Sequence, residues 1–469
     1  MKSRFLFIAL LLYLATDAQT IRVKLDAAIK KLELDDQFRH GTISMYVVES
    51  NTGKIVFEKN SQTGMAPASC QKVITSITAF ELLGKSYQYK TTIAYEGKIE
   101  EHKLTGNLYV IVSGDPTLGS WRWTNVNIEN IGKQFIASLR KAGIDMIEGD
   151  IIIDDSKWES QGTPRGWIWE DVGNYFGAGA RGLNWHENQY DLVLQPGKNV
   201  GDSVAIISMD PELQAWVLIN ELKTGPAGSG DRSIIYMPED GLIGYLRGTI
   251  PAVTSLFTIS GSIPNPVYAL EKEIGKLFYI NQIGINGRVK NSVNIYINKE
   301  RLSYKPEKIL ELSSPPLDSI NYWFLKKSVN LYGEAFVKTI AYEKKGFGAT
   351  DTGLAIIKDF WSSRGIEPSA LNMLDGSGLS PANRVTTHAL VTAMQFARKQ
   401  NWFASFYYAL PEMNKIKMKD GYIGGVRAYT GYVKSSSGTE YTFSCIVNNF
   451  AGSPATAREK IWKLLDILK

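Results

Sequence analysis

Residues 65–72 read MAPASCQK and open a run in which apolar residues recur at intervals of three and four, as in residues 73–80. This spacing predicts a helix over residues 69–83. Ser69 and Lys72 stand three residues apart in its first turn, so they share one face with Cβ atoms about 5–6 Å apart. A serine and a lysine in this relation can share a proton, as an activated serine nucleophile requires.

The segments at the two ends of the chain predict one mixed domain. Residues 24–38 carry apolar positions at helical spacing, and residues 42–57 alternate as two strands about a turn at 51–53. Helical patterns return over residues 317–343, 352–365 and 386–400, followed by strands at 426–434 and 441–448 and a helix at 456–468. We therefore expect an α/β (α+β) fold in which helices flank an antiparallel sheet.

The middle of the chain has a different residue pattern. Short β-like runs separated by Gly, Pro, Asn and Asp turns fill residues 86–305, interrupted by a helical pattern at 267–279. We predict β-rich insertions into a split domain. The predicted boundaries are residues 19–86 with 304–469 for the split domain, 87–188 with 263–303 for an inserted domain, and 189–262 for an inner one.

Composition excludes several classes of function. The 469 residues are 44% hydrophobic and 21% charged, which fits two to four globular domains. Lys and Arg total 52 against 47 Asp and Glu, a balance too even for a dedicated nucleic-acid binder. Two cysteines are too few for a disulfide scaffold or a four-cysteine zinc site. Neither H-E-x-x-H nor G-x-S-x-G occurs, which argues against zinc peptidases and α/β-hydrolases.

The amino terminus reads as an export signal. Lys2 and Arg4 precede an apolar run over residues 5–15, and Thr16 and Ala18 supply small residues before a cleavage point. We predict a signal peptide over residues 1–18 and export to the periplasm or cell envelope. No later stretch approaches 18 uninterrupted apolar residues, so we expect no transmembrane segment.

Serine acyl-transfer enzymes of the S-x-x-K type also use S-D-N and K-T-G motifs, and each has more than one candidate here. Ser292-Val293-Asn294 falls in an alternating pattern that predicts a strand, whereas residues 328–330 suit a loop that projects two polar side chains into a cleft. A literal K-T-G at residues 223–225 lies beside Pro and Gly and predicts a surface turn. A second S-x-x-K occurs at residues 138–141, so the motif alone is weak.

Three blocks together carry a family resemblance. MAPASCQK (65–72), SVNLYGE (328–334) and LDGSGLS (374–380) resemble the P-A-S-x-x-K, S-D-N-L-Y-A-E and D-G-S-G-L-S blocks of the D-alanyl-D-alanine carboxypeptidase/endopeptidase family, the low-molecular-mass class C penicillin-binding proteins. Residues 114–118 and 153–156 also resemble segments of that family's inserted domain. The resemblance implies a penicillin-binding-protein/β-lactamase-like transpeptidase fold, an activity on peptidoglycan stem peptides, covalent inhibition by β-lactam antibiotics, and no metal or organic cofactor.

The same resemblance implies a role for each matching residue. Ser69 would be the acylating nucleophile and Lys72 its base, while Ser328 would pass a proton to the leaving amine. Asn330 would hold the substrate amide, and Lys419 would supply positive charge for the substrate carboxylate.

Three further site residues follow from the resemblance. The backbone N–H groups of Ser69 and Tyr422 would form an oxyanion hole, and Gly421 matches the glycine of the family's substrate-binding strand. Asp154 would bind the amino end of a diaminopimelate side chain, although a strand-end turn explains that residue equally well.

The third block departs from the family. KDGY (419–422) stands where K-T-G-S is expected, so Asp420 and Tyr422 replace two hydroxyl-bearing residues that bind the substrate's terminal carboxylate. The carboxylate of Asp420 would repel that group unless Lys419 or Arg427 neutralises it. The expected function is a serine D-Ala-D-Ala carboxypeptidase/D,D-endopeptidase, and the alternative is a weak or inactive protein of this fold that binds the cell wall or scaffolds wall enzymes. A β-lactamase fits less well, because hydrolysing a small drug does not require so large an insertion.

The two cysteines leave alternatives open. Cys70 stands between Ser69 and Lys72, where it packs as a small apolar residue or serves as a reactive thiol. A disulfide between Cys70 and Cys445 is the further possibility, because both residues are expected beside the same cleft in an oxidising compartment.

Overall fold

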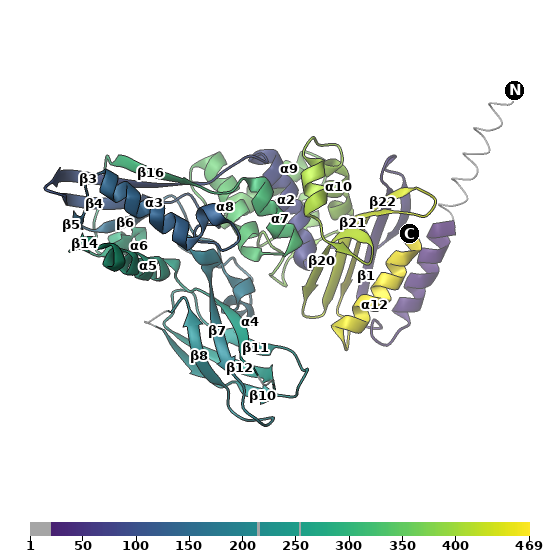
Figure 1. Ribbon diagram of the computed structural model, residues 1–469. Coiled ribbons are helices and arrows are strands. Elements are labelled where there is room, and N and C mark those ends of the chain that lie inside the picture. Colours follow the sequence, from purple (N-terminus) through teal and green to yellow (C-terminus); the bar gives the residue numbers. More distant parts are fainter. Residues whose placement is uncertain (1–19, 213–215, 253–254) are drawn as a thin grey trace. The chain divides into compact units, whose positions relative to one another are not determined.

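The computed structural model describes residues 20–212, 216–252 and 255–469, which form two compact units (Figure 1). The first unit contains the described residues up to Leu82 together with Asn321–Ser328 and Leu354–Lys469, and the second contains Leu83–Ile320 and Val329–Gly353. The predicted signal peptide lies outside the described residues, and the predicted domain boundaries stay a prediction.

A six-stranded antiparallel sheet forms the centre of the first unit, in the order β19-β20-β21-β22-β1-β2. The first and last parts of the chain meet in it, because β1 pairs with β22 along its whole length. The strands are β1 (Thr42–Glu49), β2 (Ile55–Lys59), β19 (Glu412–Met413), β20 (Ile416–Ile423), β21 (Val426–Lys434) and β22 (Glu440–Asn448). β17 (Leu371–Asn372) and β18 (Arg384–Val385) form a separate small ribbon.

Helices cover both faces of this sheet. The helix of residues 20–33 and α12 (Pro454–Leu465) lie side by side on one face, where their apolar side chains share a core with the strands (Figure 1). On the other face α10 (Thr387–Ala397) is tied to the sheet by hydrogen bonds such as that from the Tyr432 hydroxyl to the Met394 carbonyl, at 2.7 Å. The remaining helices are α2 (Lys72–Leu82), α7 (Leu317–Lys326), α9 (Thr350–Ser362) and α11 (Phe403–Ala409), with 3-10 turns η1 (Ala68–Gln71), η5 (Pro368–Ala370) and η6 (Asp466–Leu468).

The second unit is richer in strands. Its largest sheet joins β14, β5, β4, β3 and β16, with β6 beside β4 and β15 beside β6. These strands are β3 (Lys90–Glu100), β4 (Lys103–Ile111), β5 (Met146–Ile147), β6 (Ile151–Asp154), β14 (Gly284–Ile285), β15 (Val289–Asn291) and β16 (Glu307–Ser313). A three-stranded sheet contains β7 (Gln189–Gln195), β8 (Ala205–Asp210) and β13 (Phe257–Ser262). A four-stranded sheet contains β9 (Val217–Asn220), β10 (Lys223–Gly225), β11 (Arg232–Tyr236) and β12 (Ile243–Pro251).

The helices of the second unit are α3 (Ile128–Lys141), α4 (Trp169–Val172), α5 (Pro266–Asn281), α6 (Ser292–Ile297) and α8 (Asn330–Lys345), with 3-10 turns η2 (Thr124–Val126), η3 (Tyr175–Gly177) and η4 (His186–Asn188). The helical pattern predicted over residues 317–343 is two helices, α7 and α8, joined through residues 327–329. α5 confirms the helix predicted at 267–279.

Two local predictions are wrong. Ser292-Val293-Asn294 belongs to helix α6 and not to a strand, because the Asn291 side chain caps the helix by accepting a hydrogen bond from the Asn294 N–H. The literal K-T-G at residues 223–225 is the short strand β10, which pairs in parallel with β12, and not a surface turn. Thr224 is 1% exposed there, so tertiary packing overrides the local turn signal.

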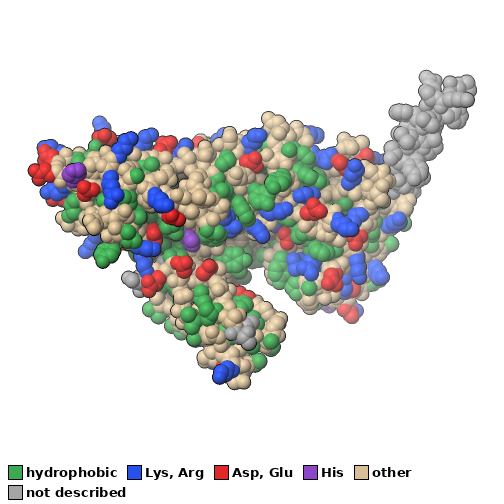
Figure 2. Space-filling view, viewed as in Figure 1, with side chains coloured by type: hydrophobic (Ala, Val, Ile, Leu, Met, Phe, Trp, Pro, Cys, Tyr) green, Lys and Arg blue, Asp and Glu red, His purple; other side chains and the backbone are tan. Residues whose placement is uncertain are grey.

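Charged side chains of both signs are interspersed over the face shown in Figure 2, in keeping with the balanced composition. Within the described ranges, no helix is both long and apolar enough to cross a membrane.

Candidate active site

Ser69 and Lys72 meet where η1 gives way to α2. The first turn is a 3-10 helix and the α-helix begins at Lys72, so the predicted single α-helix is tighter at its start. Lys72 Nζ lies 2.8 Å from Ser69 Oγ. Ala68, directly before the serine, is fully buried with φ of 45°, a backbone conformation that costs a non-glycine residue about 1–3 kcal/mol and is typical of functional sites.

Lys72 is enclosed by contacts that the sequence did not reveal. The residue is fully buried, and its Nζ donates a hydrogen bond to the Ser377 carbonyl at 2.7 Å. The same nitrogen lies 5.8 Å from the centre of the Phe324 ring. These contacts aim the amine at Ser69 Oγ, which is the arrangement that general-base activation of a hydroxyl requires.

The loop of residues 374–380 presents the Ser377 carbonyl. Asp375 is fully buried and organises the loop, because its carboxylate accepts hydrogen bonds from the Gly378 N–H at 2.8 Å and the Ser380 N–H at 2.6 Å. The Gln71 side chain donates to Asp375 Oδ1 at 2.9 Å, which joins the loop to η1. The D-G-S-G-L-S block is therefore the support of the Ser69–Lys72 pair.

Strand β20 passes directly against η1. A Cβ atom built on Gly421 would lie 2.7 Å from the Pro67 carbonyl oxygen and 3.0 Å from the Ser69 nitrogen, so only glycine fits without displacement. The Cys70 thiol donates to the Lys419 carbonyl at 3.2 Å. The structure thus brings the 65–72 and 419–422 blocks together, as the family resemblance implies.

Lys419 and Asp420 form an ion pair. Lys419 is 1% exposed, and its Nζ lies 2.9 Å from Asp420 Oδ1 and donates to the Asp420 carbonyl at 2.7 Å. Burial alone would raise the pKa of Asp420, but the charge and hydrogen bond of Lys419, with the nearby charge of Arg427, hold this pKa below its ordinary value. Asp420 is therefore a carboxylate at neutral pH.

Ser328 lies in the link between α7 and α8, as predicted for a loop. Its φ is 59°, so it too adopts a left-handed conformation that non-glycine residues seldom take. It belongs to the first unit and follows Phe324, the residue beside Lys72, by four positions.

Two predicted site residues belong to the second unit. Asn330 is the first residue of α8, is 8% exposed, and donates a hydrogen bond from its side chain to the Phe176 carbonyl at 2.7 Å. Asp154 ends β6 and accepts hydrogen bonds from the Ser156 N–H and hydroxyl at 3.0 and 2.6 Å and from the Tyr304 hydroxyl. Asp154 thus makes the contacts of the strand-end turn that was its alternative interpretation.

The cysteines do not pair. Cys70 and Cys445 are both free and fully buried. Burial raises the pKa of each thiol to about 12, so neither is a thiolate at neutral pH. Cys70 packs as a small residue between η1 and β20.

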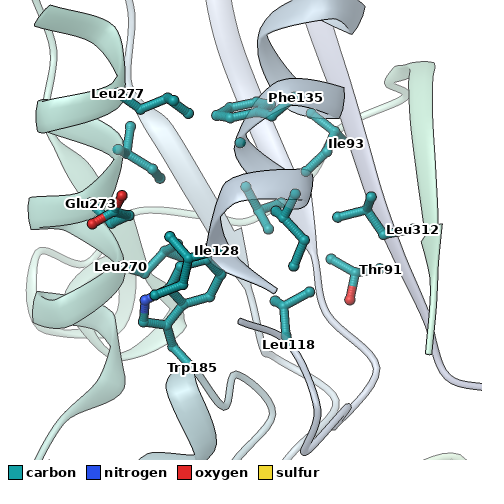
Figure 3. A pocket seen from close by; sticks show the side chains of 14 residues that line it. Thr91, Ile93, Leu118, Ile128, Phe135, Trp185, Leu270, Glu273, Leu277 and Leu312 are labelled. Carbon is teal, nitrogen blue, oxygen red and sulfur yellow. The ribbon is translucent and has the colours of Figure 1, made fainter. Parts of the chain in front are cut away.

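The second unit holds a cavity of a different kind. It has about 50 Å³ of free space and is lined almost wholly by apolar side chains, among them Phe135, Trp185 and Leu277, with Glu273 as its one charged group (Figure 3). Most of these side chains belong to that unit's own hydrophobic core. Within the described ranges no three His, Cys, Asp or Glu side chains are grouped to hold a metal ion.

Comparisons with known proteins agree with this geometry. Residues 25–468 match the model of the D-Ala-D-Ala carboxypeptidase 3 (S13) family. The chain is 26% identical over 450 residues to a D-alanyl-D-alanine carboxypeptidase of Actinomadura sp. (strain R39), covering 90% of this chain and 80% of that protein. It is 24% identical over 461 residues to the D-alanyl-D-alanine carboxypeptidase DacB of Haemophilus influenzae, covering 92% and 91%.

A solved structure supports the fold. The crystal structure of penicillin binding protein 4 (dacB) from Haemophilus influenzae matches with a TM-score of 0.79 at 21% identity, over 94% of this chain and 97% of that one. This likeness confirms the predicted penicillin-binding-protein fold. Because the family model spans nearly the whole described chain, the protein belongs to the D-Ala-D-Ala carboxypeptidase 3 (S13) family of serine peptidases.

Proposed function

We propose that this protein is an exported, penicillin-sensitive serine peptidase that cleaves D-Ala-D-Ala and cross-link bonds in peptidoglycan stem peptides, with Ser69 as its nucleophile. The observation that carries the proposal is the buried Lys72 amine, held 2.8 Å from Ser69 Oγ while it also donates to the Ser377 carbonyl. A neutral amine in this position donates one N–H to the carbonyl and keeps its lone pair for the serine proton.

Acylation then proceeds in two steps. Ser69 Oγ forms a bond to the carbonyl carbon of the penultimate D-alanine while its proton moves to Lys72 Nζ. The oxyanion of the tetrahedral intermediate is held by the backbone N–H groups of Ser69 and Tyr422, and the place of Gly421 against the Ser69 nitrogen supports this pairing. The C–N bond breaks as the leaving amine takes a proton through Ser328, and water later hydrolyses the serine ester.

The remaining role concerns the substrate. Within the first unit, Lys419 contributes positive charge beside the carboxylate-binding strand. A β-lactam acylates the same Ser69 hydroxyl: the lactam C–N bond opens, its amine stays attached to the acyl group, and water hydrolyses the resulting ester slowly.

Penicillin labelling tests the proposal. Incubation of the folded protein with a fluorescent penicillin is expected to leave a covalent label on wild type and none on Ser69→Ala. Ser437→Ala removes an exposed hydroxyl from a turn of the same unit and should keep the label. Digestion of purified muropeptides then separates trimming of monomers from cutting of cross-linked dimers.

One observation favours the second candidate, an inactive protein that binds the wall or scaffolds wall enzymes. Asp420 engages the Lys419 ammonium, which in an active enzyme would face the substrate carboxylate. A folded wild type that takes no penicillin label and cleaves no muropeptide would establish this candidate and overturn the proposed activity. Rapid turnover of the penicillin would instead indicate a β-lactamase.

A further inference from the structure

Arg427 carries a buried nitrogen that no described residue hydrogen-bonds, although the Asp420 carboxylate lies near enough to feel its charge. It lies on β21 opposite Tyr422 of β20, and its guanidinium carbon is 4.3 Å from the centre of the Tyr422 ring. Its Nε is buried and has no hydrogen-bond partner among the described residues, which also provide no ion-pair partner for it. Because buried N–H groups are nearly always satisfied, an unpartnered guanidinium nitrogen points to a group that binds there.

Three more unpartnered donors accompany it. The Tyr429 hydroxyl, Arg458 Nε and Trp462 Nε1 are all buried without hydrogen-bond partners within the described ranges, and Tyr429 is only 1% exposed. Arg458 and Trp462 are one turn apart on α12, with the guanidinium carbon 5.2 Å from the indole ring. Tyr429 follows Arg427 by two residues, so both project from the same face of β21.

The charges of these groups act on one another. Burial raises the pKa of Tyr429, while Arg427 and Arg458 both oppose that rise and Asp420 adds to it. Both guanidinium groups therefore lie near the tyrosine hydroxyl. The negative charge of Asp420 is matched by Lys419 at 2.9 Å, which leaves the two arginines as an excess of positive charge.

This excess adjoins the catalytic strand. Asp420 and Tyr422 alternate with Lys419 and Gly421 along β20, so by register they share a face with Tyr429 and Arg427 of β21. Gly421, between Asp420 and Tyr422, faces the other side of β20, where it packs against the Ser69 nitrogen. β19 pairs only with Ile416 and Lys417 of β20, so residues 419–422 form an edge of the sheet that a ligand can approach from either face.

We propose that Arg427, supported by Arg458 and Tyr429, binds the substrate carboxylate that adjoins the scissile amide, in place of the hydroxyls that a K-T-G-S strand would supply. The inference rests on the proposed function and names the residue that sets its specificity for an anionic leaving group. Guanidinium groups bind carboxylates through charged, often paired hydrogen bonds, which explains why a strand carrying Asp420 and Tyr422 can still receive an anionic substrate.

Two matched peptides test this role. One is an acylated peptide ending in D-Ala-D-Ala with a free carboxylate, and the other is the same peptide with a terminal carboxamide. Arg427→Gln should lower kcat/KM for the carboxylate peptide by about 10- to 100-fold, mainly through KM, because a charged hydrogen bond is lost. It should change kcat/KM for the carboxamide peptide little, so the preference of the enzyme for the carboxylate collapses.

Three further variants complete the experiment. Arg427→Lys should retain part of the preference, since it keeps the charge without the paired donors. Arg458→Gln should reduce the preference less than Arg427→Gln does, and it provides the test if Arg427→Gln does not fold. Lys463→Gln removes an exposed positive charge from the same α12 and should leave both kcat/KM values unchanged.

Two results would overturn the inference, and they can be told apart. If Ser69 still takes the penicillin label and the arginine variants keep the wild-type preference for the carboxylate peptide, the role of Arg427 is refuted while the proposed function stands. A folded wild type that takes no label and cleaves neither peptide refutes the proposed function and this inference together.

Discussion

Gly421→Ala is the sharpest test of how the site is built. The added Cβ would lie 2.7 Å from the Pro67 carbonyl oxygen and 3.0 Å from both the Ala68 Cβ and the Ser69 nitrogen, whereas ordinary contact begins at 3.4 Å. β20 and η1 must therefore separate by about 0.7 Å at the closest point. That displacement moves the Ser69 N–H relative to the N–H of Tyr422, the other proposed oxyanion donor.

The expected loss of acylation rate follows from how strongly catalysis depends on the positions of the reacting and stabilising groups. A misplacement of about 1 Å in an active site costs about 100-fold in rate, so we expect Gly421→Ala to slow acylation of Ser69 by about 10- to 100-fold. Overpacking of this kind also costs about 1–3 kcal/mol of stability, a loss that should leave the protein folded at 25 °C.

The assay is the second-order rate constant for labelling by a fluorescent penicillin, measured beside the Tm of each variant. Gly424→Ala is the matched control, because a Cβ at that glycine of the β20–β21 turn meets nothing within 4 Å, and it should acylate at the wild-type rate. If Gly421→Ala acylates as fast as wild type with an unchanged Tm, β20 does not press on Ser69 as described and the proposed oxyanion hole fails with it.

Three other predictions concern further buried groups. The Cys70 thiol should resist a thiol-specific disulfide reagent at pH 8 in the native protein and react only after denaturation, because burial raises its pKa to about 12; stoichiometric native labelling would contradict this. Burial raises the pKa of Asp115 from 3.8 to about 6, because it disfavours the charged carboxylate. The protonated carboxyl group therefore contributes its full stabilisation below about pH 4. This stabilisation is lost as the pH rises through 6, and the free energy of unfolding falls by up to about 3 kcal/mol. Chemical denaturation from pH 4 to 7 should therefore show a smaller fall in the unfolding free energy for Asp115→Asn than for wild type, and parallel curves would refute the assignment. Lys338 is 1% exposed, forms an ion pair with Glu159 at 3.0 Å and donates hydrogen bonds to the Gln161 and Ala180 carbonyls at 2.6 and 2.7 Å. Because Lys338→Met removes one partner of this buried ion pair, it should lower the free energy of unfolding in chemical denaturation by about 3–5 kcal/mol, while the exposed Lys344→Met on the same helix should lower it little; equal losses for the two variants would contradict this.

Local pattern predicted most elements of the first unit. The helix around Ser69, the antiparallel strands of the carboxyl-terminal region and the loop at Ser328 all follow from spacing of apolar residues and from turn residues close in sequence. The same reasoning was wrong at residues 292–294 and 223–225. Residues 292–294 alternate like a strand, but they form a helix because the Asn291 side chain caps it. Residues 223–225 have the composition of a turn, but they form a strand because they pair in parallel with β12.

The contacts that organise the site could not be read from the chain. The Ser377 carbonyl reaches Lys72 from 305 residues away, and no side-chain pattern encodes a backbone acceptor. Likewise, no described residue hydrogen-bonds the Nε of Arg427, and this depends on what packs around it, which the sequence of β21 does not reveal.

The sequence by itself determined which groups are available for chemistry. These are the Ser69 hydroxyl and the Lys72 amine, one helical turn apart, and the charged strand that contains Lys419, because residue identity and local spacing are enough to specify them. Only the tertiary structure decided that the Ser377 carbonyl holds the Lys72 amine in place and that glycine alone fits between β20 and η1. The physical reason is that these outcomes depend on distances of a few tenths of an ångström between segments far apart in the chain, and close packing sets such distances only when the whole unit has folded.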